Sequence, residues 1–367
     1  MTGPAASATP VRIDVPSRAG AYPVMIAPGI SNRLPRLLED VRRRGKCVLV
    51  SNITVWRFHG ERIRDLSADE PILLPDGERF KTLQIVGRVY EGLIRARADR
   101  GSTVIALGGG VLGDTAGFAA ATYLRGIPLV HVPTTLLAQV DSAIGGKVGV
   151  NHAAGKNLIG SFHPPALVAI DPELLATLPR REFRAGLYET IKYGVIASRP
   201  LFDVLNESLS AVFARDPAPL MRVIAESCGI KARVVTEDEH ETGIRRTLNF
   251  GHTVGHALEA VTKYRRFRHG EAVGYGMLAA AHIGASRGAM PPDDQEALAR
   301  LIRAMGPLPA VGDLSAGQIL DAIGHDKKIV NGRLHFVLPK AIGTCEVVDD
   351  VTTEEIERAL AALGLAR

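Results

Sequence analysis

Apolar, β-branched runs alternate with amphipathic segments through the first half of this 367-residue chain. The pattern predicts short buried strands and intervening helices, with strands at residues 47–51, 71–74, 103–107 and 129–132 and helices at 55–66 and 83–96. Parallel strands must be joined by long crossovers, which are usually helices. The alternation therefore predicts an α/β domain in which helices cover the faces of a parallel sheet.

The pattern changes after Asp171-Pro172. From there on it predicts long helices, at residues 181–197, 220–236, 246–262, 271–286 and 293–305. The chain exceeds the roughly 250–300 residues at which a single core stops growing. We therefore predict an N-terminal α/β domain over residues 1–171 and a mainly α-helical domain over residues 172–367, with the active site in the cleft between them.

Composition excludes several classes of protein. The cysteines are three and scattered, which supports neither a disulfide framework nor a thiolate zinc site. No apolar stretch resembles a signal peptide or approaches the roughly 18 residues of a membrane span, so we expect a cytoplasmic protein without a membrane partner. The net charge is +5, but Lys and Arg are dispersed and no aromatic residues interleave with them. We expect no nucleic-acid partner, and a small anionic substrate explains the basic balance equally well.

A glycine-rich turn follows the strand predicted at residues 103–107. Three glycines, Gly108 to Gly110, precede a helical segment. Backbone N–H groups at such a helix start can bind a pyrophosphate, where any Cβ would block its approach. The spacing is not G-x-G-x-x-G, and a tight connection is the alternative. Gly117 then serves helix packing, and Asp114 is a favourable acid near the helix start.

Two further polar segments are candidate binding loops. Residues 76–82 follow a predicted strand and contain Glu78 and Lys81, although a surface turn with Thr82 as the helix N-cap is the alternative. Residues 141–157 place Asp141, Lys147, Lys156 and Asn157 among four glycines. This stretch is too glycine-rich for a regular helix and suits a loop or hairpin that wraps a phosphate.

Three segments of the helical half together predict a metal site through Glu189, His252 and His269. Two imidazoles and one carboxylate suit a divalent ion such as zinc, and three protein ligands leave positions open for a substrate. His256 follows His252 by four residues, so both lie on one helix face about 6 Å apart. Lys192 shares a face with Glu189. Paired histidines on a helix are more often packing residues, but Asn249 and the third histidine segment favour a site.

The chain resembles the sugar phosphate cyclases, and among them the 3-dehydroquinate synthases of the shikimate pathway. The resemblance extends in order from about residue 76 to residue 345. The segments that carry it are 76–82, 108–117, 121–126, 133–142, 145–147, 155–157, 248–256 and 326–328. The glycine turn and the metal triad alone would also fit iron-type and glycerol dehydrogenases.

The resemblance implies a role for each matching residue. The divalent metal, zinc or cobalt, would be bound by Glu189, His252 and His269. NAD would be bound in the Rossmann-like domain by Asn52, Asp76, Glu78, Lys81, Gly109, Gly110, Val111, Gly113, Asp114, Thr134, Thr135, Lys156 and Thr177. The substrate phosphate would be bound by Lys147, Asn157, Asn249, His256 and one of Lys327 and Lys328, with Arg125 contributed by the other subunit of a homodimer. The substrate carboxylate would meet Lys231 and Arg245, and the catalytic set would be His256, Glu241, Lys192 and Asp141.

The activity that the resemblance implies is conversion of 3-deoxy-D-arabino-heptulosonate 7-phosphate to 3-dehydroquinate and phosphate. The reaction would use transient oxidation by NAD, β-elimination of phosphate, re-reduction, ring opening and an intramolecular aldol closure. Three alternatives remain at this point. One is another sugar phosphate cyclase of the 2-deoxy-scyllo-inosose or valiolone synthase type, another is a metal-dependent polyol dehydrogenase, and the third is a binding protein without activity.

Overall fold

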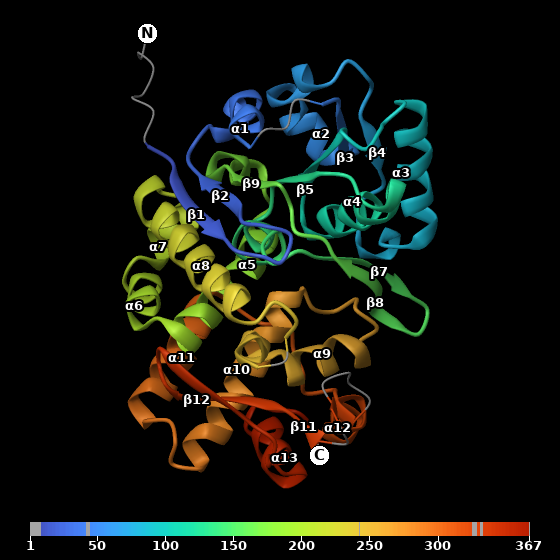
Figure 1. Ribbon diagram of the computed structural model, residues 1–367. Coiled ribbons are helices and arrows are strands. Elements are labelled where there is room, and N and C mark those ends of the chain that lie inside the picture. The colour runs from blue at the N-terminus through green and yellow to red at the C-terminus, as the bar shows by residue number, and fades with distance from the viewer. Residues whose placement is uncertain (1–8, 42–44, 242, 325–328, 331–332, 367) are drawn as a thin grey trace. The chain divides into compact units, whose positions relative to one another are not determined.

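The computed structural model describes residues 9–41, 45–241, 243–324, 329–330 and 333–366 (Figure 1). The chain divides into two compact units. Unit 1 comprises Met1–Pro179 and Leu220–Thr236, and unit 2 comprises Arg180–Pro219 and Glu237–Arg367. The predicted second domain covered residues 172–367, whereas most of α8 (Pro217–Glu237) belongs to unit 1. The reason lies in its contacts, because the thiol of buried Cys228 donates to the Gln139 carbonyl and Lys231 pairs with Asp141.

A seven-stranded sheet forms the centre of the described part of unit 1, in the order β1-β2-β9-β6-β5-β3-β4. Only β1 runs antiparallel to its neighbour in this sheet. The strands are β1 (Val11–Val15), β2 (Tyr22–Ile26), β3 (Cys47–Asn52), β4 (Ile72–Leu74), β5 (Thr103–Gly108), β6 (Leu129–Pro133) and β9 (Leu167–Ile170). The predicted parallel α/β sheet is confirmed.

Alternate residues of the central strands enter two separate cores. Val104 and Ala106 of β5 pack with α3 (Leu83–Arg95) and α4 (Gly110–Thr122) on one face. Ile105 and Leu107 pack on the other face with α1 (Leu34–Asp40) and the segment after α2 (Ile53–His59). Because both faces are buried, each of these strands reads as a continuous apolar run.

A hairpin of β7 (Lys147–His152) and β8 (Gly155–Phe162) completes the described part of unit 1, together with several single turns. Residues 138–142 form a π-helical turn, η6, before the hairpin. The glycine-rich segment 141–157 is thus a turn followed by a hairpin, as its composition suggested. The turns elsewhere in unit 1 are η1 (Ile30–Arg33), η2 (Gly60–Arg62), η3 (Arg64–Leu66), η4 (Glu78–Phe80), η5 (Tyr123–Arg125) and η7 (Pro172–Thr177).

Unit 2 is mainly helical. Its helices are α5 (Arg180–Ala197), α6 (Arg199–Glu207), α7 (Leu209–Ala214), α9 (His252–Val261), α10 (His269–Ser286), α11 (Pro292–Ala304), α12 (Ala316–Gly324) and α13 (Thr353–Ala362). A 3-10 turn, η8 (Ile244–Asn249), precedes α9. Two small antiparallel pairs accompany them, β10 (Ile329–Val330) with β11 (Arg333–Leu334), and β12 (Phe336–Ala341) with β13 (Thr344–Val348).

Two predicted helices are wrong in extent. The helix expected at 55–66 ends at His59, because Gly60 follows and the chain continues as short 3-10 turns. The helix expected at 246–262 is interrupted at Gly251, whose φ of 77° is left-handed. Asn249 therefore lies in η8 and not on the helix of His252 and His256. The interruption places His252 at the first position of α9.

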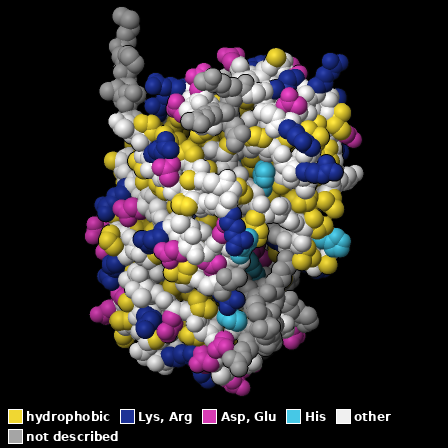
Figure 2. All heavy atoms as spheres, in the orientation of Figure 1, with side chains coloured by type: hydrophobic (Ala, Val, Ile, Leu, Met, Phe, Trp, Pro, Cys, Tyr) yellow, Lys and Arg dark blue, Asp and Glu magenta, His cyan; other side chains and the backbone are white. Residues whose placement is uncertain are grey.

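The described helices include none with both the length and the apolar character of a membrane span. On the face drawn in Figure 2, Lys and Arg side chains are interspersed with Asp and Glu. All three cysteines are free, with Cys47 and Cys228 buried and Cys345 partly exposed.

His131 on β6 gives unit 1 a dependence of stability on pH. The side chain is buried, and this burial together with the charge of His163 lowers its pKa from the usual 6.5 to about 4. Between these two pH values His131 is protonated in the unfolded chain and neutral in the folded chain. The free energy of unfolding must therefore fall as the pH falls through this window, by up to about 3 kcal/mol from this residue.

We expect His131→Phe to flatten that dependence, because it keeps a ring in the core and removes the titrating group. Urea unfolding of both proteins at pH 7.5, 6, 5 and 4.5 measures the effect. A variant whose unfolding midpoint declines as steeply as that of the parent protein would show that another group is responsible.

Candidate functional site

Unit 2 gathers four potential metal donors from three helices. The ligand atoms of His252, His256 and His269 all lie within 4.8 Å of one another. Glu189 Oε1 on α5 lies 3.7 Å from His252 Nε2 and 3.5 Å from His269 Nε2. The three predicted ligands are thus brought together. His256 joins the cluster as a fourth donor, with its ring centroid 5.3 Å from that of His252.

The Glu189 carboxylate is buried and ionised. Its side chain is only 1% exposed, and the Lys192 ammonium pairs with Oε2 one helical turn away. Burial by itself would raise the pKa of Glu189. The charge of Lys192 and the hydrogen bond and charge of His269 outweigh that effect and lower the pKa to about 2. A carboxylate held in this form is ready to bind a cation.

Both predicted histidine ligands have an oriented ring. His252 Nδ1 lies 3.0 Å from the Phe250 carbonyl oxygen, and His269 Nδ1 lies 3.1 Å from Glu259 Oε2. In each ring this contact leaves Nε2 directed toward Glu189. Burial would lower the pKa of His269, but hydrogen bonds to Glu189 and Glu259 raise it to about 10. A metal ion at His269 Nε2 therefore takes the place of a proton.

A second buried carboxylate joins α10 to α5. Glu271 is fully buried and accepts hydrogen bonds from Arg181 at 2.7 and 2.9 Å and from Arg184 at 2.7 Å. It also accepts from the backbone N–H of Arg268 at the start of α10. Burial would raise its pKa, and the Arg181 and Arg184 hydrogen bonds lower it. The clamp fixes the start of the helix that carries His269 against the helix that carries Glu189.

Sequence reasoning missed Glu259 and Glu271. Glu271 is the third residue of α10 and accepts from the Arg268 N–H three residues earlier, a spacing that the sequence shows. Glu259 follows His252 by seven residues, which places it on the same helix face. The spacing does not reveal that Glu271 pairs with two arginines on α5, nor that Glu259 contacts a histidine on α10.

The donor set fits a divalent metal. Two imidazole nitrogens and a carboxylate oxygen converge, as zinc and cobalt sites require. Oε1 of the buried Glu189 carboxylate faces the Nε2 atoms of His252 and His269, while Oε2 pairs with Lys192. The three proposed ligand atoms therefore face one another, as ligands of one metal ion must.

Three further predicted residues lie in or beside η8 of unit 2. Arg245 is 2% exposed, and its Nη1 donates to the Glu239 carbonyl at 2.5 Å. Asn249 Nδ2 donates to Glu241 Oε1 at 2.8 Å, so the predicted proton acceptor and the predicted phosphate ligand are partners. Glu241 has a left-handed φ of 62°. Lys327 and Lys328 lie outside the described residues.

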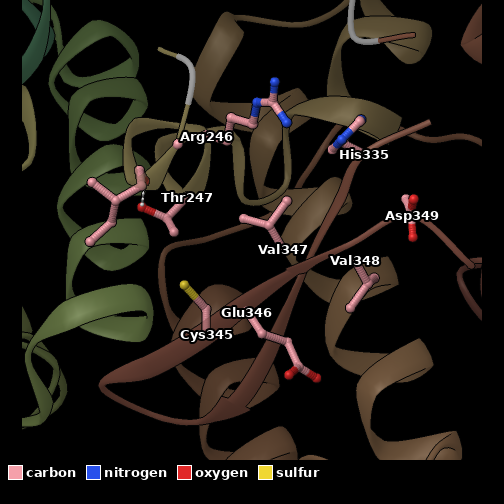
Figure 3. Close-up of a pocket in the computed structure, with 10 residues that line it drawn as sticks. Arg246, Thr247, His335, Cys345, Glu346, Val347, Val348 and Asp349 are labelled. Carbon is pink, nitrogen blue, oxygen red and sulfur yellow. Dashed lines mark hydrogen bonds between the residues drawn. The ribbon is translucent and has the colours of Figure 1, made fainter. Parts of the chain in front are cut away.

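A cavity of about 470 Å³ lies between η8 and the β12–β13 hairpin (Figure 3). Arg246, Thr247 and His335 line it together with Cys345 and Val347 of β13. It contains none of the predicted site residues. Burial raises the pKa of the Cys345 thiol to about 12.

The glycine turn of unit 1 has the form expected of a dinucleotide cradle. β5 ends at Gly108, Gly109 is the N-cap of α4, and Val111 and Gly113 lie in the first turns of that helix. A Cβ on Gly109 would lie 2.9 Å from Thr135 Cγ2, and one on Gly110 would lie 2.8 Å from Ser142 Oγ.

Two buried hydroxyls beside this turn, those of Thr134 and Ser142, have no hydrogen-bond partner among the residues that the structure describes. Thr134 is joined to the turn through its backbone N–H, which donates to the Gly108 carbonyl. Unpaired hydroxyls beside a glycine turn at a helix start fit a bound dinucleotide phosphate.

The other predicted NAD ligands of unit 1 fall into separate groups. Lys81 donates to Asp114 Oδ2 and Asn157 Oδ1, both at 2.5 Å, so three predicted residues form one cluster. Burial raises the pKa of Asp114 against the attraction of Lys81. Among the other predicted ligands, Glu78 accepts from Asn151 and Asp76 accepts from Thr54. The Thr177 hydroxyl is hydrogen-bonded to His59, and Asn52 is the N-cap of α2 and accepts from the Val55 N–H. Thr82 is the N-cap of α3, as the surface-turn alternative for residues 76–82 predicted.

The predicted anion ligands of unit 1 lie on the hairpin and α8. Lys147 begins β7, and Lys156 and Asn157 lie near the start of β8. Lys231 Nζ lies 2.8 Å from Asp141 Oδ1, which joins a predicted substrate ligand to a predicted catalytic residue.

Arg125 lies in a strained turn. Leu124 and Arg125 have φ values of 50° and 70°, and Gly126 has a φ of 117°. Two successive side-chain-bearing residues in the left-handed region cost roughly 1–3 kcal/mol each. Such strained residues persist only where the surrounding structure holds the backbone in that conformation.

Comparison with known proteins points in one direction. Residues 71–185 match the family 3-dehydroquinate synthase N-terminal, and residues 186–329 match 3-dehydroquinate synthase C-terminal. A 3-dehydroquinate synthase of Solibacter usitatus (strain Ellin6076) is 46% identical over 342 residues, covering 92% of this chain and 95% of the relative.

Two solved structures have a similar fold and lower identity. One is 2-epi-5-epi-valiolone synthase from Streptomyces hygroscopicus subsp. jinggangensis 5008 with NAD⁺ and Zn²⁺ bound, with a TM-score of 0.84 at 28% identity over 93% of this chain and 96% of that one. The other is a 2-deoxy-scyllo-inosose synthase complexed with carbaglucose-6-phosphate, NAD⁺ and Co²⁺, with a TM-score of 0.83 at 26% identity over 95% and 99%.

The cluster of four donors generates a prediction that separates ligand from neighbour. We expect His252→Ala to lose the metal, because only two of the three proposed ligands remain and these are too few for tight binding. We expect His256→Ala to keep the metal and lose turnover. Metal content after dialysis against a weak chelator, measured by mass spectrometry, tests both. Loss of the ion from the His256 variant would make His256 a ligand.

Proposed function

The chain belongs to the 3-dehydroquinate synthase family, and from that premise we propose how its residues share the work of the reaction. The enzyme converts 3-deoxy-D-arabino-heptulosonate 7-phosphate to 3-dehydroquinate and phosphate, a step of the shikimate pathway toward aromatic amino acids. The single observation that carries the proposal is the meeting of Glu189, His252 and His269 in unit 2. The two solved structures of other cyclases are similar in fold, but their sequence identity to this chain is only 28% and 26%.

Glu189, His252 and His269 are the proposed metal ligands, and the turn at Gly109 and Gly110 is the proposed site of the NAD pyrophosphate. When bound, NAD supplies a hydride acceptor that is regenerated in each cycle, and the metal supplies a Lewis acid for the substrate oxygens. The reaction needs both at one centre. The proposal therefore requires residues of unit 1 and unit 2 to act on the same substrate molecule.

Proton transfer falls to side chains of unit 2. His256 lies beside the proposed ligands without being one of them, so it is available to bind the substrate phosphate and to move a proton. Glu241 is the second proposed proton acceptor, and the Asn249 amide fixes its carboxylate. Lys192 keeps Glu189 ionised, which a carboxylate must be to bind a metal.

Cationic and amide side chains bind the two anionic ends of the substrate. Lys147, Asn157 and Asn249 are the proposed phosphate ligands, along with one of Lys327 and Lys328. Arg245 and Lys231 are the proposed carboxylate ligands. Lys231 is paired with Asp141. The substrate carboxylate therefore competes with the Asp141 carboxylate for Lys231, and Asp141 loses this contact when the substrate binds. Because one carboxylate replaces another beside Lys231, recognition of the substrate carboxylate depends on charge as well as on shape.

We further propose a homodimer in which Arg125 enters the site of the other subunit. Leu124, next to Arg125, is 41% exposed, and Phe162 at the end of β8 is 43% exposed. Their segments are neighbours, because a Cβ on Gly126 would lie 3.9 Å from His163. Apolar side chains beside a strained turn favour a partner surface there. A cytoplasmic location is proposed as well, since three free thiols suit a reducing compartment.

Substrate preference tests the function. The heptulosonate carries a carboxylate that glucose 6-phosphate and sedoheptulose 7-phosphate lack, and a site in which the buried Arg245 meets that carboxylate can discriminate against those sugars by as much as about 10⁴-fold. We expect Arg245→Leu to reduce kcat/KM for the heptulosonate far more than for a carboxylate-free sugar phosphate. Lys147→Ala, the matched control, should weaken all phosphorylated substrates alike.

The assay follows phosphate release, product mass and NADH absorbance together. Because the hydride returns within each cycle, no NADH should accumulate. Stoichiometric NADH would favour a polyol dehydrogenase, and equal turnover of sedoheptulose 7-phosphate would favour another cyclase.

Mixing two inactive variants tests the shared site. Arg125→Ala lacks the arginine and His252→Ala lacks a metal ligand, and each alone should be inactive. A hybrid dimer has one site with both groups if Arg125 acts across the interface, so co-expression should restore about a quarter of the parent activity. No recovery in hybrids isolated with two different affinity tags would place Arg125 in its own subunit's site.

A further inference from the structure

Glu259 is a buried carboxylate on α9 that the proposed reaction does not use. Its side chain is 5% exposed, and Oε2 lies 3.1 Å from His269 Nδ1. Its residue neighbours on one helix face are His252 and His256, at seven and three residues toward the N-terminus. One face of α9 thus presents a proposed metal ligand, a proposed proton carrier and a carboxylate directed at the ligand of the next helix.

A neutral imidazole binds a metal through one nitrogen only if the other carries the proton. A hydrogen-bond acceptor at Nδ1 fixes that proton there and leaves the Nε2 lone pair for the ion. In His269, Glu259 is that acceptor, and Nε2 faces Glu189 Oε1 at 3.5 Å. Glu259 therefore selects both the tautomer and the direction of the ring.

The two proposed histidine ligands differ in what fixes them. His252 Nδ1 is 3.0 Å from a backbone carbonyl, that of Phe250, and no side-chain substitution removes that contact. His269 is the first residue of α10, its side chain is 31% exposed, and its Nδ1 contacts a side chain, that of Glu259. Orientation of the second ligand therefore depends on a residue that mutation can change.

We propose that Glu259 is a positioning residue that presents His269 Nε2 to the metal and so sets the affinity of the site for its ion. The proposal rests on the metal-ligand set proposed above. Through Glu259, α9 contributes to the site twice, once as a ligand and once as the support of the ligand on α10.

The test measures metal affinity, which a role confined to packing would not change in the same way. Zn²⁺ dissociation constants are measured by competition with a chromophoric chelator for the parent protein, Glu259→Leu and Glu259→Gln. We expect roughly 10–100-fold weaker binding in the leucine variant. The glutamine variant, which can still accept a hydrogen bond through its amide oxygen, should fall between the two.

Glu355→Gln is the matched control. Glu355 pairs with Arg287 in the same unit and contacts none of the three histidines in the described structure, so Zn²⁺ affinity should not change. The visible absorption spectrum of the Co²⁺ form gives a second measurement, because a rotated or lost His269 ligand changes the coordination of the ion. We expect an altered spectrum in both Glu259 variants and the parent spectrum in the control.

The outcomes separate the inference from the proposed ligand set. Parent-like Zn²⁺ affinity and Co²⁺ spectrum in Glu259→Gln and Glu259→Leu, with the metal lost from His252→Ala, would overturn the role of Glu259 and leave the ligand set intact. Retention of the metal by His252→Ala would overturn both. If Glu259→Leu does not fold, the glutamine variant decides, and parent values for it reject the proposal.

Discussion

The position of His269 depends on how closely α10 approaches α5 and α9. A Cβ on Gly270 would lie 2.0 Å from the Ala185 carbonyl oxygen, and one on Gly276 would lie 1.7 Å from the Gly251 carbonyl oxygen. The opposing atoms belong to the backbone, so they can move only if the helices move. The glycines thus allow three helices to meet almost without intervening side chains, and donors on all three then lie within a few ångströms of one point.

Buried charges in both units are held in pairs. Lys192 pairs with Glu189, Arg181 and Arg184 pair with Glu271, and Lys81 pairs with Asp114. Loss of one partner would leave the other as an uncompensated charge wherever that group is buried, which destabilises a fold strongly. A paired group is also held in one orientation. The same contacts that make burial tolerable therefore keep the charges of the site in place before any ligand arrives.

The sequence predicts the elements whose signals are local and misses those that depend on tertiary contacts. β5 and β6 are buried on both faces, so their apolar runs identify them. β1 is largely exposed at the edge of the sheet, and its pattern is too weak to predict. The break at Gly251 was missed because a glycine within a helical pattern is usually tolerated. The ligand histidines were found through a motif, but the role of Glu259 appears only when α9 packs against α10.

The burial of the thiols has a consequence for the chemistry of the chain outside its reaction. Burial raises the pKa of Cys47 and Cys228, and that of Cys345 reaches about 12. The thiolate is the form that reacts with electrophiles and oxidants, and at neutral pH these groups are protonated. Reagents that inactivate enzymes by alkylating cysteine therefore meet little accessible nucleophile in the folded protein. A thiol label at Cys47 or Cys228 therefore reports on unfolding more than on the native state.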